Sequence, residues 1–384
     1  MRVAFYAPLK PPDHPVPSGD RRVAQQIMAA LAMAGHDVEL AARLRSFEGA
    51  GDSERQTRLA GLGGRLAQRY IHRLYDRPFV NRPRAWITYH LYYKAPDWIG
   101  PRVAGKLGIP YIVIEASVAQ KRAGGPWSLG HEATIAGLAR AAAVISLNAA
   151  DEAGVAPHVA HAERLHRLKP FLDRTAYARA AAERDRHRVA VATRFGLDPR
   201  RPWLLSVGMM RPGDKLESYK VLAESLGQLA STPWSLLIVG DGSARDDVRA
   251  AFAGFADRIA YAGALAESAL PPIYAAADVY VWPAVNEAFG MAILEAQATG
   301  LPVVAGDSGG VGGIVAQGVT GLLVPPRDAD ALATALGPLL EDRSRARGMA
   351  QAAIDKVAAE HDLRVASRQL DAILHAVAQS MAGA

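Results

Sequence analysis

The sequence predicts an α/β protein of two similar domains, each a parallel sheet with crossover helices. Its 384 residues are enough for two domains at roughly 100–200 residues each. Short β-branched runs alternate with alanine-rich helical segments along the whole chain. Such alternation is typical of parallel strands joined by helices.

The first half begins with a strand at residues 2–7, an apolar run that Pro8 ends. Its apolar and β-branched composition also predicts strands at 37–42, 86–90 and 111–116,. Helices are expected between them, where apolar residues recur at helical spacing, at 22–34 and 98–107,.

The same rhythm restarts in the second half. Strands are expected at 203–208, 235–240, 258–263, 279–284 and 301–306,. The intervening segments predict helices near 219–229, 244–252, 271–276 and 289–299, and another after Gly312,.

The two sheets are separated by a charged stretch that starts after Lys169-Pro170 and ends in a turn-forming LDPRRP,. We therefore predict a first domain over 1–170 and a second over 171–364. In the last segment, Val365, Leu370, Leu374 and Val377 fall at helical spacing,. We expect residues 365–384 to form a helix that packs back on the first domain.

The composition is that of a folded protein with 50% hydrophobic and 21% charged residues, and a mean hydropathy of +0.02,. Without cysteine, the chain has no disulfide, thiolate nucleophile or iron–sulfur cluster. The apolar run at the N-terminus is far shorter than a signal-peptide core, and no uncharged apolar stretch approaches the ~18 residues of a membrane span. We expect a cytoplasmic protein whose membrane contact, if any, is peripheral.

The net charge of +6 is concentrated in one stretch. Residues 43–84 contain ten Arg and no Lys against four acidic residues, so this stretch alone carries +6. The remainder of the chain is nearly neutral. The excess positive charge therefore belongs to the first domain.

Within this stretch, residues 55–74 have apolar residues at helical spacing, with Arg58, Arg65, Arg69 and Arg73 at other positions,. A basic amphipathic helix can lie on an anionic membrane, or it can pack its apolar stripe on its own domain. Three glycines, at 61, 63 and 64, should weaken a long interfacial helix. No stacking platform or DNA-reading motif accompanies the arginines, so nucleic acid is not expected as a partner.

Several cofactor motifs are absent. No GxGxxG follows the first strand, and neither GxxxxGK[ST] nor HExxH occurs. These absences argue against a nicotinamide-dependent enzyme, a P-loop nucleotidase and a zinc protease. The eleven histidines form no ligand-spaced cluster, and no metal is expected.

The most informative segment follows the strand that ends at Trp282-Pro283. Here a loop presents Glu287, a helix is expected to begin near Phe289, and Glu295 lies two turns further on. The first N–H groups of a helix bind phosphate well. At ~1.5 Å rise per residue the carboxylates are about 12 Å apart, too far for one acid/base pair but suitable for gripping two ends of one ligand.

Four segments together resemble the donor-binding half of the family 4 glycosyltransferases. They are EAFGMAILEAQATGLPVV from Glu287, VGDG from Val239, the Y-x-x-A-D run from Tyr274, and GVTGLLVPPRDADALA from Gly318. The first domain is similar to the family's other half through Pro17-Ser18-Gly19-Asp20 and a helix ending in Gly-His-x-Val. The resemblance implies a GT-B fold, with two Rossmann-like domains facing across a cleft, and a retaining sugar transfer.

The resemblance also implies which residues bind the donor. Glu295 would hold the ribose hydroxyls, Glu287 would face the transferred sugar, and the N–H groups of Phe289, Gly290 and Met291 would meet phosphates or sugar. Such backbone donors suit a diphosphate.

Two cations are implied at the diphosphate. Arg211 and Lys215 follow Gly208 where the family carries a phosphate-clamping pair, although here Arg211 lies three residues after the glycine rather than one. Fixed positive charge would stabilise the leaving diphosphate. Gly263, with Tyr261, would line the base pocket.

On the acceptor side the implied residues are fewer. Gly19 would let the donor phosphates approach the backbone. Many family members carry a histidine that faces the sugar after the strand that ends near Ile114, whereas this chain has Glu115. His90 is the histidine left on a strand end, and it would be the catalytic residue on that face. His90 and Glu115 are equally compatible with buried structural residues. In the implied mechanism the leaving diphosphate itself accepts the acceptor's proton.

We therefore expect a hexosyltransferase-type enzyme that uses a UDP- or GDP-linked sugar and no cofactor. Its acceptor would be a glycan, a lipid-linked molecule or a small molecule, and the basic 43–84 region would meet an anionic membrane at its inner face. Two alternatives stay open: an epimerase-like GT-B enzyme, which turns over donor without acceptor, and a non-catalytic sugar-nucleotide-binding protein.

Overall fold

A computed structural model describes residues 1–16 and 18–382. Pro17, which belongs to the expected glycine loop, lies outside the described residues. The chain forms two units: Met1–Lys169 with Leu363–Ala384, and Pro170–Asp362. Each unit has its own parallel sheet, as the alternating sequence pattern predicts.

The first unit contains a six-stranded sheet in the order β2-β1-β3-β4-β5-β6, and every pair of neighbours is parallel. Its four central strands are almost fully buried, whereas the edge strands β2 and β6 are partly exposed, as expected for a sheet covered by helices on both faces. The strands are β1 (Arg2–Tyr6), β2 (Asp37–Leu40), β3 (Ala85–Tyr92), β4 (Tyr111–Ser117), β5 (Ala143–Ser146) and β6 (Leu165–Arg167).

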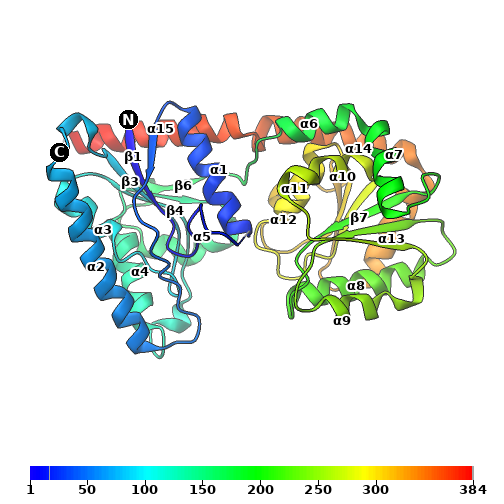
Figure 1. Ribbon diagram of the computed structural model, residues 1–384, viewed down its shortest axis with the longest axis horizontal. Coiled ribbons are helices and arrows are strands. Elements are labelled where there is room, and N and C mark those ends of the chain that lie inside the picture. Colours follow the sequence, from blue (N-terminus) through cyan, green and yellow to red (C-terminus); the bar gives the residue numbers. More distant parts are fainter. Residues whose placement is uncertain (17, 383–384) are drawn as a thin grey trace. The chain divides into compact units, whose positions relative to one another are not determined.

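Helices α1 to α5 and the C-terminal helix α15 surround this sheet (Figure 1). Ser18 caps α1 by accepting a hydrogen bond from the Arg21 N–H,. The helices are α1 (Gly19–Met33), α2 (Ser53–Tyr75), α3 (Gly100–Leu107), α4 (Ser128–Arg140), α5 (Ala149–Val155) and α15 (Leu363–Ala382).

The C-terminal helix returns to the first unit, as predicted. Helix α15 packs along α1 and buries Leu370, Leu374 and Val377. His36 Nε2, just before β2, lies 3.0 Å from Oδ1 of Asp371 on α15. Apolar burial and this polar contact together attach the chain's last helix to its first domain.

The second unit contains a six-stranded parallel sheet in the order β12-β11-β10-β7-β8-β9. It has one large apolar core. The strands are β7 (Trp203–Val207), β8 (Ser235–Val239), β9 (Ile259–Gly263), β10 (Val279–Trp282), β11 (Val303–Gly306) and β12 (Gly321–Val324).

The five helices predicted for the second unit are present, two of them with shifted starts, and α6, α7, α13 and α14 are not predicted by the sequence. Helix α8 begins five residues before the predicted Tyr219, because the Pro212-Gly213 turn ends directly at its first residue. Helix α11 begins two residues after Phe289, because Gly290 adopts the left-handed conformation at its N-cap. The helices are α6 (Thr175–Ala182), α7 (Arg184–Phe195), α8 (Asp214–Gln228), α9 (Arg245–Ala251), α10 (Leu270–Ala276), α11 (Met291–Ala298), α12 (Val311–Ile314), α13 (Ala329–Glu341) and α14 (Arg343–Lys356).

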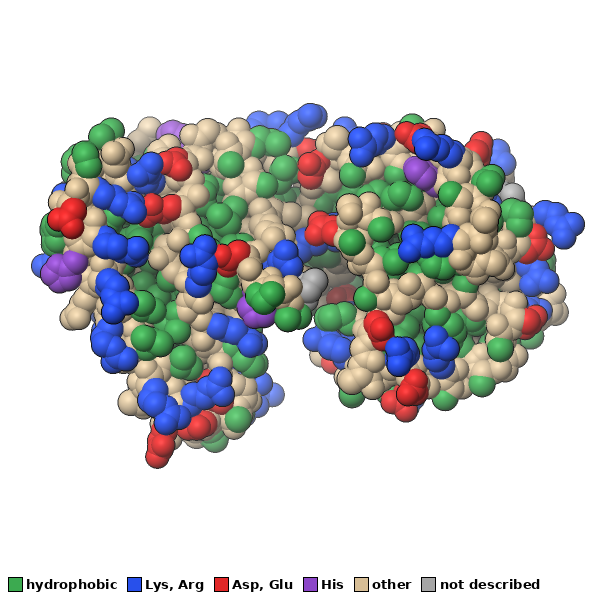
Figure 2. Space-filling model, viewed as in Figure 1, with side chains coloured by type: hydrophobic (Ala, Val, Ile, Leu, Met, Phe, Trp, Pro, Cys, Tyr) green, Lys and Arg blue, Asp and Glu red, His purple; other side chains and the backbone are tan. Residues whose placement is uncertain are grey.

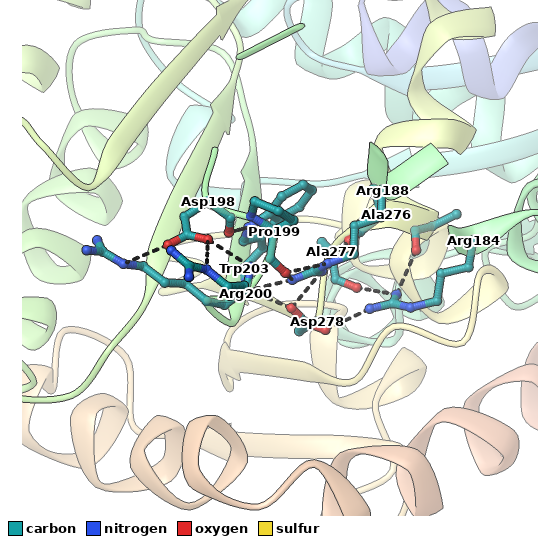
Figure 3. Close-up of polar contacts among 11 residues, drawn as sticks. Arg184, Arg188, Asp198, Pro199, Arg200, Trp203, Ala276, Ala277 and Asp278 are labelled. Carbon is teal, nitrogen blue, oxygen red and sulfur yellow. Dashed lines mark hydrogen bonds and ion pairs between the residues drawn. The ribbon is translucent and has the colours of Figure 1, made fainter. Parts of the chain in front are cut away.

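An arginine pair on α7 binds the C-terminal end of α10 (Figure 3). Arg184 and Arg188 donate to the carbonyls of residues 275–277 and to both carboxylate oxygens of Asp278. Asp278 also accepts a 2.7 Å hydrogen bond from the Trp203 N–H at the start of β7. The last carbonyls of a helix lack partners within it, so this arrangement gives the Asp of the Y-x-x-A-D run a structural role.

Among residues 1–16 and 18–382, no helix is both long enough and apolar enough to span a bilayer.

Candidate active site

The centre of the candidate site is a cation–carboxylate pair in the second unit. Lys215, on the first turn of α8, donates a hydrogen bond from Nζ to Oε2 of Glu287 in the loop after β10. The same Oε2 accepts a 3.0 Å hydrogen bond from Nε1 of Trp282. The Lys215 and Glu287 side chains are only 21% and 17% exposed. Two groups that the sequence singles out therefore meet in a partly buried position.

Trp282 supports both members of this pair. Its ring centroid lies 5.1 Å from Lys215 Nζ, within reach of a cation–π interaction. The ring also packs edge-on against Tyr219, with 5.1 Å between centroids. A Cβ on Gly208 would lie 3.1 Å from the ring, so the strand-end glycine leaves room for this indole.

The backbone of the loop after β10 is held in an uncommon conformation. Ala284 and Asn286 have positive φ angles of 53° and 51°, which cost energy for residues with a Cβ. The Val285 N–H donates to Oγ of Ser218, and the Asn286 side chain donates to Oδ2 of Asp214 at 2.9 Å. Both acceptors are on α8, so this helix fixes the loop that carries Glu287.

Glycines on a neighbouring loop let another backbone approach Glu287. A Cβ on Gly309 would lie 1.9 Å from the carbonyl oxygen of Glu287, and one on Gly310 would lie 2.5 Å from that of Ala288. Such distances leave no room for a side chain. The loop before α12 therefore supports the Glu287 loop by direct backbone contact.

The glycines of the VGDG run from Val239 also allow another part of the backbone to approach closely. A Cβ on Gly240 would lie 1.8 Å from the carbonyl oxygen of Gly208, and one on Gly242 would lie 2.2 Å from that of Met210. Asp241 accepts a 2.7 Å hydrogen bond from the Gly242 N–H. Gly208 and its neighbours are thus held by the β8 loop, while Arg211 is solvent-exposed.

The remaining residues that the sequence predicts for donor binding lie on or next to α11 and β9. Phe289 and Gly290 precede α11 and Met291 is its first residue, where backbone N–H groups lack intrahelical partners. Glu295 is 2% exposed, and its charge contributes, after burial, to raising the pKa of Tyr274. Gly263 ends β9 with a φ of 67°.

In the first unit, His90 and Glu115 occupy matching positions on adjacent strands. Tyr89 pairs with Ile114 and Leu91 with Ala116, so the residues between them lie side by side. Both have left-handed backbones, with φ of 62° for His90 and 63° for Glu115. Because both residues lie side by side, the backbones of β3 and β4 are distorted at the same point of the sheet,.

This distortion is accompanied by a polar cluster. His90 Nδ1 lies 2.9 Å from Oδ1 of Asp20 on α1. Glu115 is 3% exposed, and its Oε2 accepts a 2.8 Å hydrogen bond from the Leu147 N–H after β5. Gly19, one residue before Asp20, has no atom within 4 Å of the place where a Cβ would lie, so the start of α1 is open.

The cluster shifts the protonation of its members. Burial raises the pKa of Glu115 to about 7, and the charge of His90 reduces this rise. Burial also opposes the charged form of His90, but the hydrogen bond and charge of Asp20 outweigh it, so the pKa of His90 is raised. For Asp20, burial is outweighed by the hydrogen bond and charge of His90, and the pKa is lowered.

Sequence reasoning missed three residues of these clusters. Asp20 lies 70 positions from His90, and Asp214 lies 72 positions from Asn286, so no local pattern links either pair. Trp282 reads as an ordinary strand residue. A signal was available for Asp20, which directly follows the singled-out Gly19, and for Asp214, which directly precedes the singled-out Lys215.

Residues 201–342, which include the Lys215–Glu287 pair, match the family model described as glycosyl transferases group 1. Over these residues the chain is similar to the group 1 glycosyltransferases. A D-inositol 3-phosphate glycosyltransferase from Nocardia farcinica is 34% identical over 220 residues, which are 54% of this chain and 47% of that protein. The chain thus spans about half the length of the curated relatives that it matches.

Another relative is the GDP-mannose-dependent alpha-(1-6)-phosphatidylinositol monomannoside mannosyltransferase of Mycobacterium tuberculosis. It is 38% identical over 135 residues, 33% of this chain and 35% of that protein. Among solved structures, HepE from Anabaena in complex with UDP aligns with a TM-score of 0.73 at 17% identity, covering 98% of this chain and 100% of HepE. The predicted GT-B fold is thereby confirmed.

Proposed function

We propose that this protein is a group 1 glycosyltransferase that transfers a sugar from a nucleoside diphosphate sugar to an acceptor, with retention at the anomeric carbon. The observation that carries the proposal is the Lys215–Glu287 pair, held by Trp282 inside the segment that matches the family. A cation beside the carboxylate of a strained loop is suited to bind a diphosphate and the sugar attached to it.

In this proposal Lys215 and Arg211 are the electrostatic catalysts. The diphosphate gains negative charge as the bond to the sugar breaks, and cations already in place stabilise that charge in the transition state. Lys215 is held in advance by Glu287 and by the Trp282 ring. Arg211 is exposed and would fold over the donor. We propose that these cations replace a metal, so transfer should persist with a chelator.

We propose the other residues that contact the donor from their chemical type and their position in the second unit. Glu287 would face the sugar, and the N–H groups of Phe289, Gly290 and Met291 would meet its phosphates. Glu295 would bind the ribose hydroxyls, while Gly208 and Gly263 would let the nucleotide approach the backbone. Relatives are named for GDP-mannose or bind UDP, so we propose a GDP- or UDP-linked hexose.

On the acceptor side we propose His90 and Glu115, which belong to the cluster at the β3 and β4 distortion. Gly19, although in the same unit, would let the donor phosphates approach the backbone. The acceptor hydroxyl would attack from the face that the diphosphate leaves, and a diphosphate oxygen would take its proton. No protein base is then required. The acceptor would be a glycan, a small molecule or a lipid-linked precursor met at the inner face of a membrane through the basic 43–84 region.

The proposal is tested by following nucleoside diphosphate release from a panel of UDP- and GDP-sugars, with and without candidate acceptors and with EDTA. The expected result is release of one nucleotide that depends on acceptor and survives EDTA. Turnover of donor without acceptor would favour an epimerase-like reaction. Donor binding without any turnover would indicate a non-catalytic binding protein.

A further inference from the structure

Two neighbouring helices of the first unit expose positive charge almost exclusively. After Glu54 in its first turn, α2 carries no acidic residue, and α3 carries none. In Figure 2 basic side chains form a column over α2. Within the described part of the chain none of these cations pairs with a carboxylate; they are Arg55, Arg58, Arg65, Arg69, Arg73, Arg102 and Lys106.

A groove of about 520 Å³ lies between the two helices, a volume typical of small-molecule sites. Its apolar floor is made by Ala67 and Ile71, and no acidic residue is among its described lining. Its polar groups come from both helices and are the side chains of Gln68, His72, Arg102 and Lys106. An anion in this groove would meet donors on both sides.

Two glycines of α2 allow close packing beside this groove, and Gly64 is part of its lining. A Cβ on Gly63 would lie 2.3 Å from Cβ of Trp98, and one on Gly64 would lie 2.4 Å from Nη1 of Arg102. Gly64 therefore lets the guanidinium of Arg102 lie directly against α2. Helix α2 nevertheless runs without interruption over 23 residues, and Gly64 allows Arg102 of α3 to pack closely on it.

Beyond one end of the groove lies an exposed apolar tip. Tyr75, itself part of the groove lining, is 53% exposed, Phe79 is 69% exposed and Val80 is 82% exposed. The guanidinium of Arg82 lies over the Tyr75 ring and that of Arg84 over the Phe79 ring, at 5.8 and 5.5 Å. Aromatic rings beside basic groups are characteristic of the bilayer interface, whereas a free anion in water gains nothing from an apolar tip.

We propose that the groove between α2 and α3 binds the phosphate of an anionic phospholipid headgroup, while Phe79 and Val80 enter the interfacial layer. The inference rests on the membrane contact proposed above and assigns it a site. The positive charge of the groove favours an anionic headgroup as the ligand. The exposed Phe79 and Val80 favour a bilayer over a soluble phosphate as its source.

The experiment is co-sedimentation of the full chain with phosphatidylcholine vesicles with and without phosphatidylglycerol. Binding should require phosphatidylglycerol. A basic residue near an anionic surface contributes about 1 kcal/mol, or roughly fivefold, so the double substitution Arg102→Gln and Lys106→Gln should weaken binding by roughly 25-fold. The matched control, Arg345→Gln with Arg347→Gln on exposed positions of α14, removes the same charge and should leave binding within about twofold of wild type.

A glycine pair tests the groove itself. Gly64→Ala would displace the Arg102 guanidinium, whereas a Cβ on Gly61 of the same helix meets Arg65 at an ordinary 3.6 Å. Both changes favour the helix equally, so only Gly64→Ala should weaken vesicle binding. Phe79→Ser with Val80→Ser should weaken it as well.

Equal binding to both vesicle types would overturn the proposal, and so would equal effects of the groove and α14 double variants. Displacement of the protein from vesicles by inorganic phosphate would also overturn it, because it would indicate a free-phosphate site. Preferential binding of RNA would overturn it too. Nucleotide release with a soluble acceptor is measured in parallel without vesicles. That reaction should be unchanged in the groove variants, which separates failure of this inference from failure of the proposed transfer.

Discussion

Lys215 Nζ and Glu287 Oε2 are hydrogen-bonded across 72 positions of sequence. The pair joins the first turn of α8 to the loop after β10, and Trp282 donates to the same carboxylate oxygen. The lysine is therefore held in place before any donor arrives. Such preorganisation is what electrostatic catalysis requires, and it makes the supporting residues as testable as the pair itself.

Replacing Trp282 by Phe should lower kcat/KM for transfer by roughly tenfold or more. The change keeps an aromatic ring but removes the N–H that donates to Glu287, and hydrogen bonds to charged groups contribute ~1.5–3 kcal/mol. The matched control is Trp234→Phe, which removes another buried indole N–H, one that donates to the Leu229 carbonyl at 2.9 Å. Equal losses in the two variants would show that Trp282 acts only through packing.

Gly309→Ala should destabilise the second unit by a few kcal/mol and weaken donor binding. Its φ of 55° and the 1.9 Å approach to the Glu287 carbonyl oxygen leave no room for a methyl group, and a left-handed backbone costs about 1–2 kcal/mol for residues other than glycine. Gly313→Ala is the control, since nothing lies within 4 Å of its Cβ position. Thermal melts with and without a donor measure both effects, and indistinguishable melts would refute the proposed support of the Glu287 loop.

Asp20→Asn should lower the pKa of His90. In the wild-type protein the hydrogen bond and charge of Asp20 raise the pKa of His90 and outweigh burial, which lowers it. An Asn side chain at position 20 supplies no charge. The pKa is measured from the imidazole proton resonances between pH 5 and 9. His36 is the internal control because its carboxylate partner, Asp371, is untouched. An unchanged His90 titration would mean that Asp20 does not set the charge of this histidine.

Glu115→Gln should flatten the pH dependence of stability in the first unit. Burial raises the pKa of Glu115 from 4.5 to about 7, so between these values the folded carboxyl keeps a proton that the unfolded one has lost. Stability therefore falls as pH rises through this window, by about 3 kcal/mol at most. The raised pKa of His90 acts in the same direction, because its contribution is present at low pH and lost above the folded pKa.

Hydrogen exchange of β3 and β4 peptides at pH 5 and pH 8 measures this change. Wild type should lose more protection than Glu115→Gln between the two values. Gln retains an oxygen that can accept from the Leu147 N–H, so packing is preserved. Identical losses would contradict the assignment of the effect to the Glu115 carboxyl.

The sequence predicts the two parallel sheets and the crossover helices because both depend on local periodicity. It also singles out Glu287 and Lys215, which lie in recognisable segments and which the structure brings together. It does not predict the supporting contacts, since Asp20–His90 and Asp214–Asn286 join distant positions. Nor does it predict the positive φ of Ala284, because nothing in a non-glycine residue signals a left-handed backbone. Tertiary packing determines these features.

The same limit applies to the basic helix. Its glycines suggest weakness when taken one at a time, because glycine lowers helix propensity. In the folded unit Gly63 and Gly64 are positions where Trp98 and Arg102 of the adjoining segment pack against α2. Propensity is thus overridden by a close helix contact that no spacing within α2 reveals.

The central claim is that Lys215 neutralises the leaving diphosphate. Its most direct test compares kcat/KM for acceptor-dependent transfer in two variants, Lys215→Ala and Lys220→Ala. Both remove a lysine from α8, and Lys220→Ala is the control because Lys220 is exposed. Loss of one preorganised transition-state contact lowers the rate by roughly 100- to 1,000-fold, so we predict a fall of this size in Lys215→Ala and a wild-type value in Lys220→Ala. A wild-type kcat/KM in Lys215→Ala would contradict the claim.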